Sequence, residues 1–328
     1  MRYWWVNHKQ TFQQEFGGNY IWSPKTKRDG SFNRFYETMR EVAPGDVVFS
    51  YAGGVIRGFG IAQTHCYTSP RPNEFGHIGE VWDRLGWRVD VSFARIIPTL
   101  RPSDHMQALS AVLPKDYKLL TTAGHGYQHI YLAPIPKKMA LVLGQLINPT
   151  LLRIVQDTRT AEEPNVIDTE LRGINEWEQA EANRILQSRT LAETTRQALI
   201  KARVGQGLFR QKLTSFENHC RITGVTYQPH LFASHIKPWR ESTNEERLNG
   251  ENGLLLTPSI DHLFDRGFIS FEDNGELMIS DVAHKESIQR MGVDTKHIVR
   301  VGNFSDGQRF FLAHHRRSVF LQARSTAS

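Results

Sequence analysis

The most informative part of the sequence lies between residues 234 and 265 and contains three segments. These are Ser234-His235-Ile236-Lys237-Pro238-Trp239, Asn252-Gly253-Leu254-Leu255-Leu256 and Asp261-His262-Leu263-Phe264-Asp265. A histidine ends the first short apolar segment, and an Asn-Gly pair opens the second. Before the third segment, Thr257 is a good N-cap and Pro258 suits the first helical position. The pattern predicts two short strands followed directly by a helix.

The residue types in this stretch suit metal-assisted hydrolysis. Asp261 and Asp265 stand four positions apart in the predicted helix, so they share one face about 6 Å apart. Two carboxylates so placed suit a hard divalent ion such as Mg²⁺ or Mn²⁺. His235 can take a proton from water because the unperturbed pKa of histidine is about 6.5. An activated water and a metal are what phosphodiester hydrolysis needs.

The three segments look like the HNH endonucleases, whose site is a ββα-metal finger. Two upstream segments, 203–210 (RVGQGLFR) and 220–224 (CRITG), resemble the same subgroup, so the resemblance covers about residues 195–275. It implies that His235 is the general base and that Asn252 ties the connecting loop and orients the histidine. It also implies that the helix bears the metal, with His235, Asp261 and Asp265 as the candidate ligands.

Two positions in the finger depart from the family pattern or leave it ambiguous. Many HNH fingers have an acidic residue or a histidine just before the base histidine, where this chain has Ser234. Metal binding should therefore depend more on the helix. The third residue of the HNH motif is ambiguous. Its spacing from Asn252 favours Asp261, whereas the residue type favours His262. We prefer Asp261, with Asp265 beside it.

Residues 1 to about 155 contain short apolar runs broken by Gly and Pro, the pattern of strands in a small mixed barrel. The predicted strands are 3–6, 20–22, 46–51, 58–62 and 87–91, with a short helix at 35–39 before a turn at 44–46. The segments 3–7, 20–24 and 47–62 resemble the EVE and YTH branch of PUA-like domains. That branch encloses a modified base in an aromatic pocket, and the resemblance covers about residues 1–150.

The resemblance implies a base-reading pocket in the N-terminal half. A base enters such a pocket by leaving the duplex stack, which costs a few kcal/mol that aromatic stacking and hydrogen bonds recover. Trp22 is the first candidate for a pocket wall, with Tyr51 or Trp5 opposite. The candidates for reading the base edge are Asn7, Ser23 and Asn33. Side chains alternate along a strand, so either Trp4 or Trp5 should be a core residue.

The totals allow about two globular domains. The chain has 328 residues, of which 39% are hydrophobic and 23% charged, and its net charge of +6 permits a polyanionic partner. No apolar run is long enough to span a bilayer, and the N-terminal segment has no signal-peptide core, so a cytoplasmic location is expected. We predict an α+β fold class: a PUA-like EVE barrel at 1–155, a linker with a helix at 156–192 and an HNH domain at 193–328.

Together the two resemblances imply a modification-dependent endonuclease of the type IV restriction kind. It would bind double-stranded DNA carrying 5-methylcytosine or 5-hydroxymethylcytosine and spare unmodified DNA. Cutting both strands needs two active sites or two events, which a homodimer would supply. One alternative is a nuclease acting on modified RNA. Another is a binding protein with an inactive finger, which His235 and Asn252 argue against and Ser234 leaves open.

Overall fold

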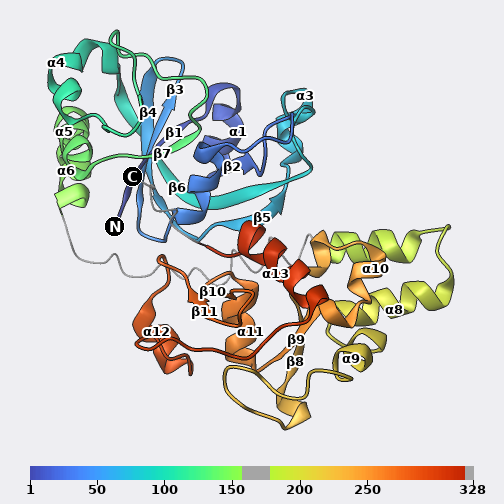
Figure 1. Ribbon diagram of the computed structural model, residues 1–328. Helices are drawn as coiled ribbons and strands as arrows, with labels where there is room; N and C mark the ends of the chain where they lie inside the picture. The colour runs from blue at the N-terminus through green and yellow to red at the C-terminus, as the bar shows by residue number, and fades with distance from the viewer. Residues whose placement is uncertain (157–177, 322–328) are drawn as a thin grey trace. The chain divides into compact units, whose positions relative to one another are not determined.

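The computed structural model describes residues 1–156 and 178–321, and the chain divides into two compact units, Met1–Gly173 and Ile174–Ser328 (Figure 1). Both units mix helices with sheets, so the predicted α+β class is confirmed. The predicted linker, 156–192, falls partly on residues 157–177, which lie outside the described residues. Among the helices described, none is both long enough and apolar enough to cross a membrane.

A curled seven-stranded sheet forms the centre of the N-terminal unit, in the order β2-β6-β4-β3-β1-β7, with β5 also paired to β6. The parallel pair is β1 with β3, and the other pairs are antiparallel. The long β6 pairs with β2 and β5 through its first part and with β4 through its second, so this one strand carries the curl. The strands are β1 Tyr3–Asn7, β2 Tyr20–Pro24, β3 Val47–Ala52, β4 Val55–Ala62, β5 Tyr67–Pro70, β6 Leu85–Leu100 and β7 Leu132–Pro134.

The main core of this unit packs helices against the sheet. Phe49 and Ile56 from the sheet meet Met139 and Leu143 of α5 in one buried cluster. All five predicted strands are present, and the predicted helix at 35–39 lies within α2 and η2. The helices are α1 Phe12–Gly17, α2 Arg34–Glu37, α3 Gly76–Gly79, α4 Met106–Leu109, α5 Lys137–Ile147 and α6 Pro149–Gln156, with 3-10 turns η1 Lys9–Thr11, η2 Thr38–Glu41, η3 Asn73–Phe75, η4 Pro102–His105 and η5 Ser110–Val112.

The C-terminal unit contains the predicted strand-strand-helix order. Strand β8 pairs antiparallel with β9, which places His235 opposite Gly253. Residues 178–187 are helical. The strands are β8 Phe232–His235, β9 Gly253–Leu256, β10 Ile269–Phe271 and β11 Leu277–Ile279. The helices are α8 Glu193–Arg203, α9 Leu208–Leu213, α10 Asn244–Arg247, α11 Pro258–Asp265, α12 Lys285–Arg290 and α13 Asp306–Ser318, with 3-10 turns η6 Gln228–His230, η7 Trp239–Glu241 and η8 Gly250–Asn252.

The segment from 193 to 219 is not one continuous helix. Helix α8 ends at Arg203, α9 ends at Leu213, and residues 214–219 are not helical. Gly205 and Gly207 interrupt the helix because both have positive φ, 65° and 67°. A Cβ added at Gly205 would lie 2.6 Å from the carbonyl oxygen of Ala233, so glycine lets this turn pack directly against β8.

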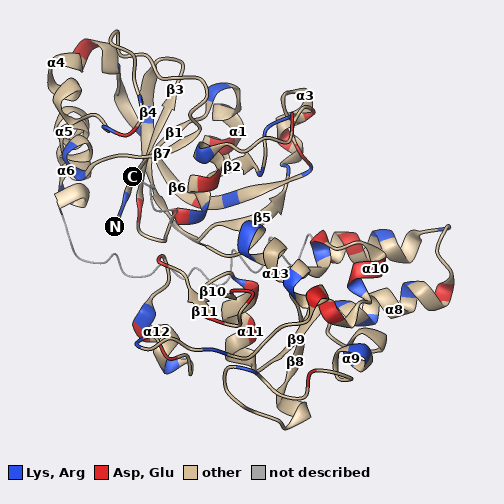
Figure 2. Cartoon of the chain, viewed as in Figure 1, with Lys and Arg blue, Asp and Glu red and all other residues tan. Residues whose placement is uncertain are grey.

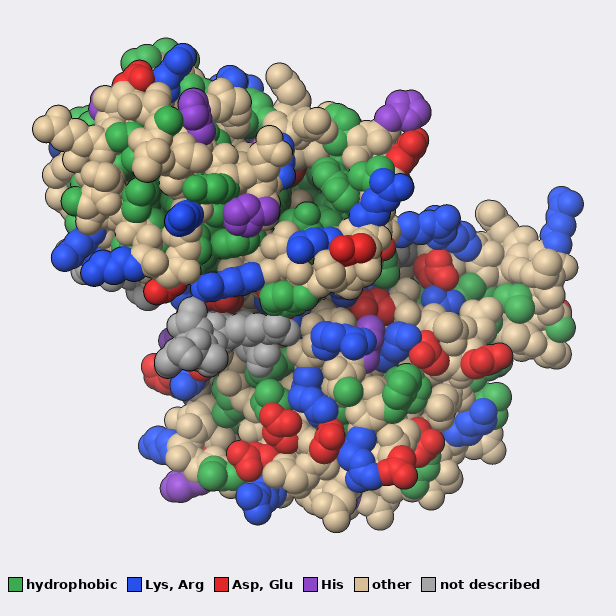
Figure 3. Space-filling model, turned by 45° about the horizontal axis from the view of Figure 1, so that its top comes forward, with side chains coloured by type: hydrophobic (Ala, Val, Ile, Leu, Met, Phe, Trp, Pro, Cys, Tyr) green, Lys and Arg blue, Asp and Glu red, His purple; other side chains and the backbone are tan. Residues whose placement is uncertain are grey.

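Charged residues of both signs occur in both units (Figure 2). On the visible face of the C-terminal unit, Lys and Arg side chains lie among Asp and Glu (Figure 3). The excess of +6 is therefore not gathered into one basic face in that view. The two cysteines, Cys66 and Cys220, are free thiols and both are buried.

Candidate nuclease site

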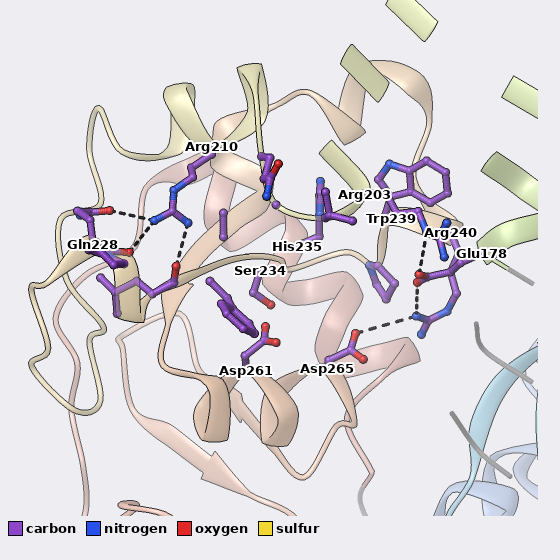
Figure 4. Close-up of a pocket in the computed structure, with 18 residues that line it drawn as sticks. Glu178, Arg203, Arg210, Gln228, Ser234, His235, Trp239, Arg240, Asp261 and Asp265 are labelled. Atoms are coloured by element: carbon purple, nitrogen blue, oxygen red, sulfur yellow. Dashed lines mark hydrogen bonds and ion pairs between the residues drawn. The ribbon is translucent and has the colours of Figure 1, made fainter. Parts of the chain in front are cut away.

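A cavity of about 550 Å³ in the C-terminal unit brings together three of the candidate residues, His235, Asp261 and Asp265. His235 and Ser234 enter it from the end of β8, and Asp261 and Asp265 enter it from α11 (Figure 4). Helix α11 begins at Pro258 and Thr257 holds the N-cap position, as the sequence predicts, but the Thr257 side chain makes no capping hydrogen bond. Because β8 and α11 pack together, residues from separate parts of the chain face one another here.

His235 is held in one orientation. Its Nε2 donates a hydrogen bond to the carbonyl oxygen of Arg247 at 3.0 Å, since a carbonyl can only accept. The ring of Phe209 stacks on the imidazole at 3.8 Å with 7° between the planes. Burial, partly offset by the hydrogen bond to Arg247, lowers the pKa of His235 to about 4. The ring is therefore neutral at pH 7, and Nδ1 carries the lone pair that a general base needs.

Asn252 ties the loop that follows His235. Its Oδ1 accepts from the backbone N–H of Lys237 at 2.7 Å, and its Nδ2 donates to the carbonyls of Lys237 and Glu246, each at 3.2 Å. The side chain is fully buried and does not line the cavity. This geometry matches the loop-tying role predicted from the sequence. The Asn252 side chain therefore contacts backbone groups around that loop and is not part of the cavity wall.

Asp261 lies beside Ser234 in the cavity wall (Figure 4). Burial raises the pKa of Asp261 to about 6; the hydrogen bond from Ser234 lowers it, and the nearby charge of Asp265 raises it. The carboxylate of Asp265 lies 4.0 Å from Nη1 of Arg240. By contrast, His262 is exposed and does not line the cavity. This arrangement supports Asp261 over His262 as the third residue of the motif.

A hard divalent ion suits the donors in this cavity, although they do not form a closed cage. Within residues 1–156 and 178–321, no three His, Cys, Asp or Glu side chains are grouped closely enough to hold a metal. The carboxylates of Asp261 and Asp265 line the same cavity as His235. Mg²⁺ typically takes one or two carboxylates and completes its shell with water and substrate phosphate. The donor set fits that mode of binding.

The candidate wall residue Trp22 lies inside an aromatic cluster. Its side chain is 2% exposed and packs with Tyr20 and Phe75, with Trp82 at the edge. The ring centroid lies 5.7 Å from that of Phe75 and 6.1 Å from that of Trp82. Trp22 therefore lies in an aromatic cluster, but its ring is covered by its neighbours and leaves no open face for a base.

Trp5 and Tyr51 do not lie opposite Trp22, contrary to the prediction. Their ring centroids are 4.8 Å apart, which is direct contact and leaves no room for a base between them. Both belong to the main core beneath the sheet, a cluster separate from that of Trp22. Trp5 lies on β1 and Tyr51 on β3, and these two strands are neighbours that pair Trp5 with Phe49 and Asn7 with Tyr51. The two rings are therefore close enough to pack together, which favours a packing role.

The three predicted edge readers are all buried, and they differ in what they contact. Asn7 donates to the carbonyl of Tyr127 at 3.4 Å. Asn33 caps α2 by accepting from the backbone N–H of Phe35 at 2.9 Å. The hydroxyl of Ser23 is buried and has no hydrogen-bond partner among the described residues. Of the three, Ser23 is the one whose side chain makes no hydrogen bond to the described residues.

The sequence reasoning did not select four charged residues of the cavity wall as site residues: Glu178, Arg203, Arg210 and Arg240. Arg203 opens the 203–210 segment that resembles the HNH subgroup, and Arg240 follows the Pro-Trp pair, so both lay beside recognised motifs. Glu178 comes from the helix at 178–187 and no local pattern marked it. Arg210, also in the wall, is occupied by the carbonyls of Leu231 and Gln228, both at 2.9 Å.

Comparison with known families identifies the C-terminal site. Residues 220–272 match the family model described as HNH endonuclease. That segment contains β8, β9 and α11, so the C-terminal unit contains an HNH endonuclease domain. A comparison with curated proteins finds no match to the chain.

Several solved structures are similar to the N-terminal half of this chain. A Pseudomonas putida protein is 14% identical, with 44% of this chain and 98% of that chain covered and a TM-score of 0.31. A hypothetical protein from Leishmania major is 9% identical, with 44% and 94% covered and a TM-score of 0.32. Human THYN1, solved in complex with DNA containing 5-methylcytosine, is 14% identical, with 44% and 97% covered and a TM-score of 0.29.

Proposed function

We propose that this protein is a modification-dependent DNA endonuclease of the type IV restriction kind. The C-terminal unit hydrolyses DNA phosphodiesters, and the N-terminal unit reads 5-methylcytosine or 5-hydroxymethylcytosine. One observation carries the nuclease part: a neutral His235 with a free Nδ1 shares a cavity with Asp261 inside an HNH domain. The reader part rests on the sequence resemblance of residues 1–150 to EVE and YTH domains.

The residues of the cavity divide the work of hydrolysis. Nδ1 of His235 takes the proton from the attacking water, and the resulting imidazolium is stabilised by the nearby carboxylate of Asp265, whose charge raises the pKa of His235. Asp261 and Asp265 would hold Mg²⁺ or Mn²⁺, which when bound carries charge that builds on the phosphate. Ser234 orients Asp261 through its hydroxyl. Asn252 keeps the loop behind His235 in place.

Base reading is proposed for the aromatic cluster around Trp22. Trp22 supplies a large stacking surface, and the neighbouring Ser23 supplies a buried hydroxyl without a partner among the described residues. Trp82 is half-buried at the edge of the cluster, so its displacement would open the face of Trp22 to a flipped base. The energy of stacking would offset part of the cost of unstacking the base from DNA.

The test is a cleavage assay of the full chain on paired substrates. Unmodified, 5-methylcytosine and 5-hydroxymethylcytosine duplexes, with matched RNA containing methylated adenine, are incubated with Mg²⁺, Mn²⁺ or EDTA. We expect metal-dependent cleavage of modified DNA, and a loss of about 10²–10⁴-fold in rate for His235→Ala. Cleavage confined to RNA would favour the modified-RNA nuclease. Binding of modified DNA with no cleavage by the wild type would favour the inactive binding protein.

A further inference from the structure

One carboxylate sits between two arginines in the wall of the nuclease cavity. Oε2 of Glu178 lies 3.4 Å from Nε of Arg203, and Oε1 lies 3.4 Å from Nη1 of Arg240 (Figure 4). Arg240 also faces Asp265 at 4.0 Å. All four residues line the cavity that contains His235.

This bridge is loose compared with a good ion pair. Charge-assisted N–H···O bonds are typically about 2.7–2.9 Å long, and both contacts of Glu178 exceed that range. The Arg240 side chain is 4% exposed, whereas Arg203 and Glu178 are 20% and 21% exposed. A partner that is poorly seated and reachable from solvent can be exchanged for a better one. Arg210 in the same wall offers no such site, because two backbone carbonyls hold its guanidinium.

A DNA phosphate could replace the Glu178 carboxylate because the two groups bind arginine in the same way. A carboxylate and a phosphate both present paired anionic oxygens to guanidinium groups, and arginine binds both with the same donor geometry. We propose that Arg203 and Arg240 form a binding site for a DNA backbone phosphate and that Glu178 occupies this site in the free protein. Glu178 is then a built-in competitor that DNA must displace. The inference rests on the proposed nuclease function and names the residues that hold the substrate backbone.

The test compares Glu178→Gln with Glu181→Gln in the full-length protein. Glu181 lies on the same helix and pairs with Arg247 at 2.9 Å, and neither of those two residues lines the cavity. Both variants remove one negative charge, so a general electrostatic gain appears in both. Affinity for a short fluorescent unmodified duplex is measured in EDTA over a range of salt concentrations. We expect the affinity of Glu178→Gln for the duplex to exceed that of Glu181→Gln by about 2–10-fold. The salt dependence of binding by Glu178→Gln should be steeper by about one phosphate contact.

A double variant tests whether Arg203 carries the gain in affinity. Arg203→Gln in the Glu178→Gln background should remove most of the gain, and thermal melts should show that all variants are folded. Equal affinities for Glu178→Gln and Glu181→Gln, or weaker binding by Glu178→Gln, would overturn the proposal. If the wild type still cleaves modified DNA in that case, only this inference fails. If no variant and no wild-type protein binds DNA, the proposed function fails with it.

Discussion

At the scale of single residues, the hydrogen bond from Nε2 of His235 to Arg247 decides which nitrogen can act. A histidine at the end of a strand could present either ring nitrogen, and the sequence alone predicts only that a base stands there. The carbonyl of Arg247 accepts a hydrogen bond from Nε2–H, so the lone pair of the neutral ring is on Nδ1. The place of His235 at the end of a strand was predictable from its motif, but the tautomer was not, because the acceptor is the last residue of α10, twelve positions along the chain.

The first prediction separates Asp261 from its neighbour. Asp261→Asn should weaken Mn²⁺-dependent cleavage at limiting metal by about 10–100-fold or more, because it removes a charged donor from the cavity. His262→Ala should change the rate by about twofold or less, because that side chain is exposed and outside the cavity. Metal titrations of the cleavage rate provide the measurement. A dead His262→Ala beside an active Asp261→Asn would reverse the assignment.

The second prediction concerns pH. The pKa of Asp261 is raised to about 6, so the carboxylate gains a proton as pH falls through that value, whereas His235 stays neutral until about pH 4. Protons therefore compete with metal for Asp261 before they inactivate the base. Below pH 6 the apparent metal affinity should fall by about tenfold per pH unit.

Activity profiles at two Mn²⁺ concentrations check this expectation. The midpoint of the acid limb should move to lower pH at the higher concentration, because metal displaces the proton. A midpoint that does not respond to metal would contradict it. Thermal melts across the same pH range serve as the control for unfolding.

At the scale of elements, those with a local sequence pattern could be predicted. Contacts between residues distant in sequence could not. The β8-β9-α11 order followed from apolar runs, an N-cap position and the four-residue spacing of two aspartates. β7 has only three residues and gains its stability from pairing with β1, so no local pattern revealed it. The bridge between Glu178 and Arg240 joins residues 62 positions apart, which no periodicity can show.

The third prediction tests the glycine that separates α8 from α9. Gly205→Ala should lower the free energy of unfolding by about 2–4 kcal/mol, because it adds left-handed backbone strain and a collision with the Ala233 carbonyl. Gly224→Ala is the matched control, since φ there is +72° and no atom lies within 4 Å of an added Cβ. Its loss should be about 1–2 kcal/mol. Urea melts of both variants give the comparison, and equal losses would show that the close approach to β8 costs nothing.

At the scale of the whole molecule, two units with separate cores are proposed to divide recognition from chemistry. Composition and length predicted two domains, and the resemblance of each half to a different family predicted their folds. The residues of the proposed reader pocket were harder to predict, because aromatic residues occur both in cores and in binding sites. Trp5 and Tyr51 show that ambiguity, since they pack against each other in the core.

The fourth prediction follows from that division. Trp22→Ala should reduce the ratio of affinities for modified and unmodified duplexes by about 5–150-fold and leave the salt slope unchanged. Because Trp22 is buried, this variant should also lose about 3–5 kcal/mol of stability, so Trp22→Phe is the milder companion. His235→Ala should keep the wild-type ratio. Binding titrations of folded variants decide the matter, and an unchanged ratio for both Trp22 variants would make Trp22 a packing residue alone.

The burial of both cysteines has a practical consequence. Cys66 and Cys220 are shielded from solvent, one in each unit, so thiol reagents should modify the native protein slowly. A single cysteine introduced at an exposed position would then be the preferred site of labelling without removal of the natural ones. One exposed cysteine in each unit would accept a fluorophore pair or two spin labels. Such a doubly labelled protein would allow the distance between the two labels to be measured with and without DNA.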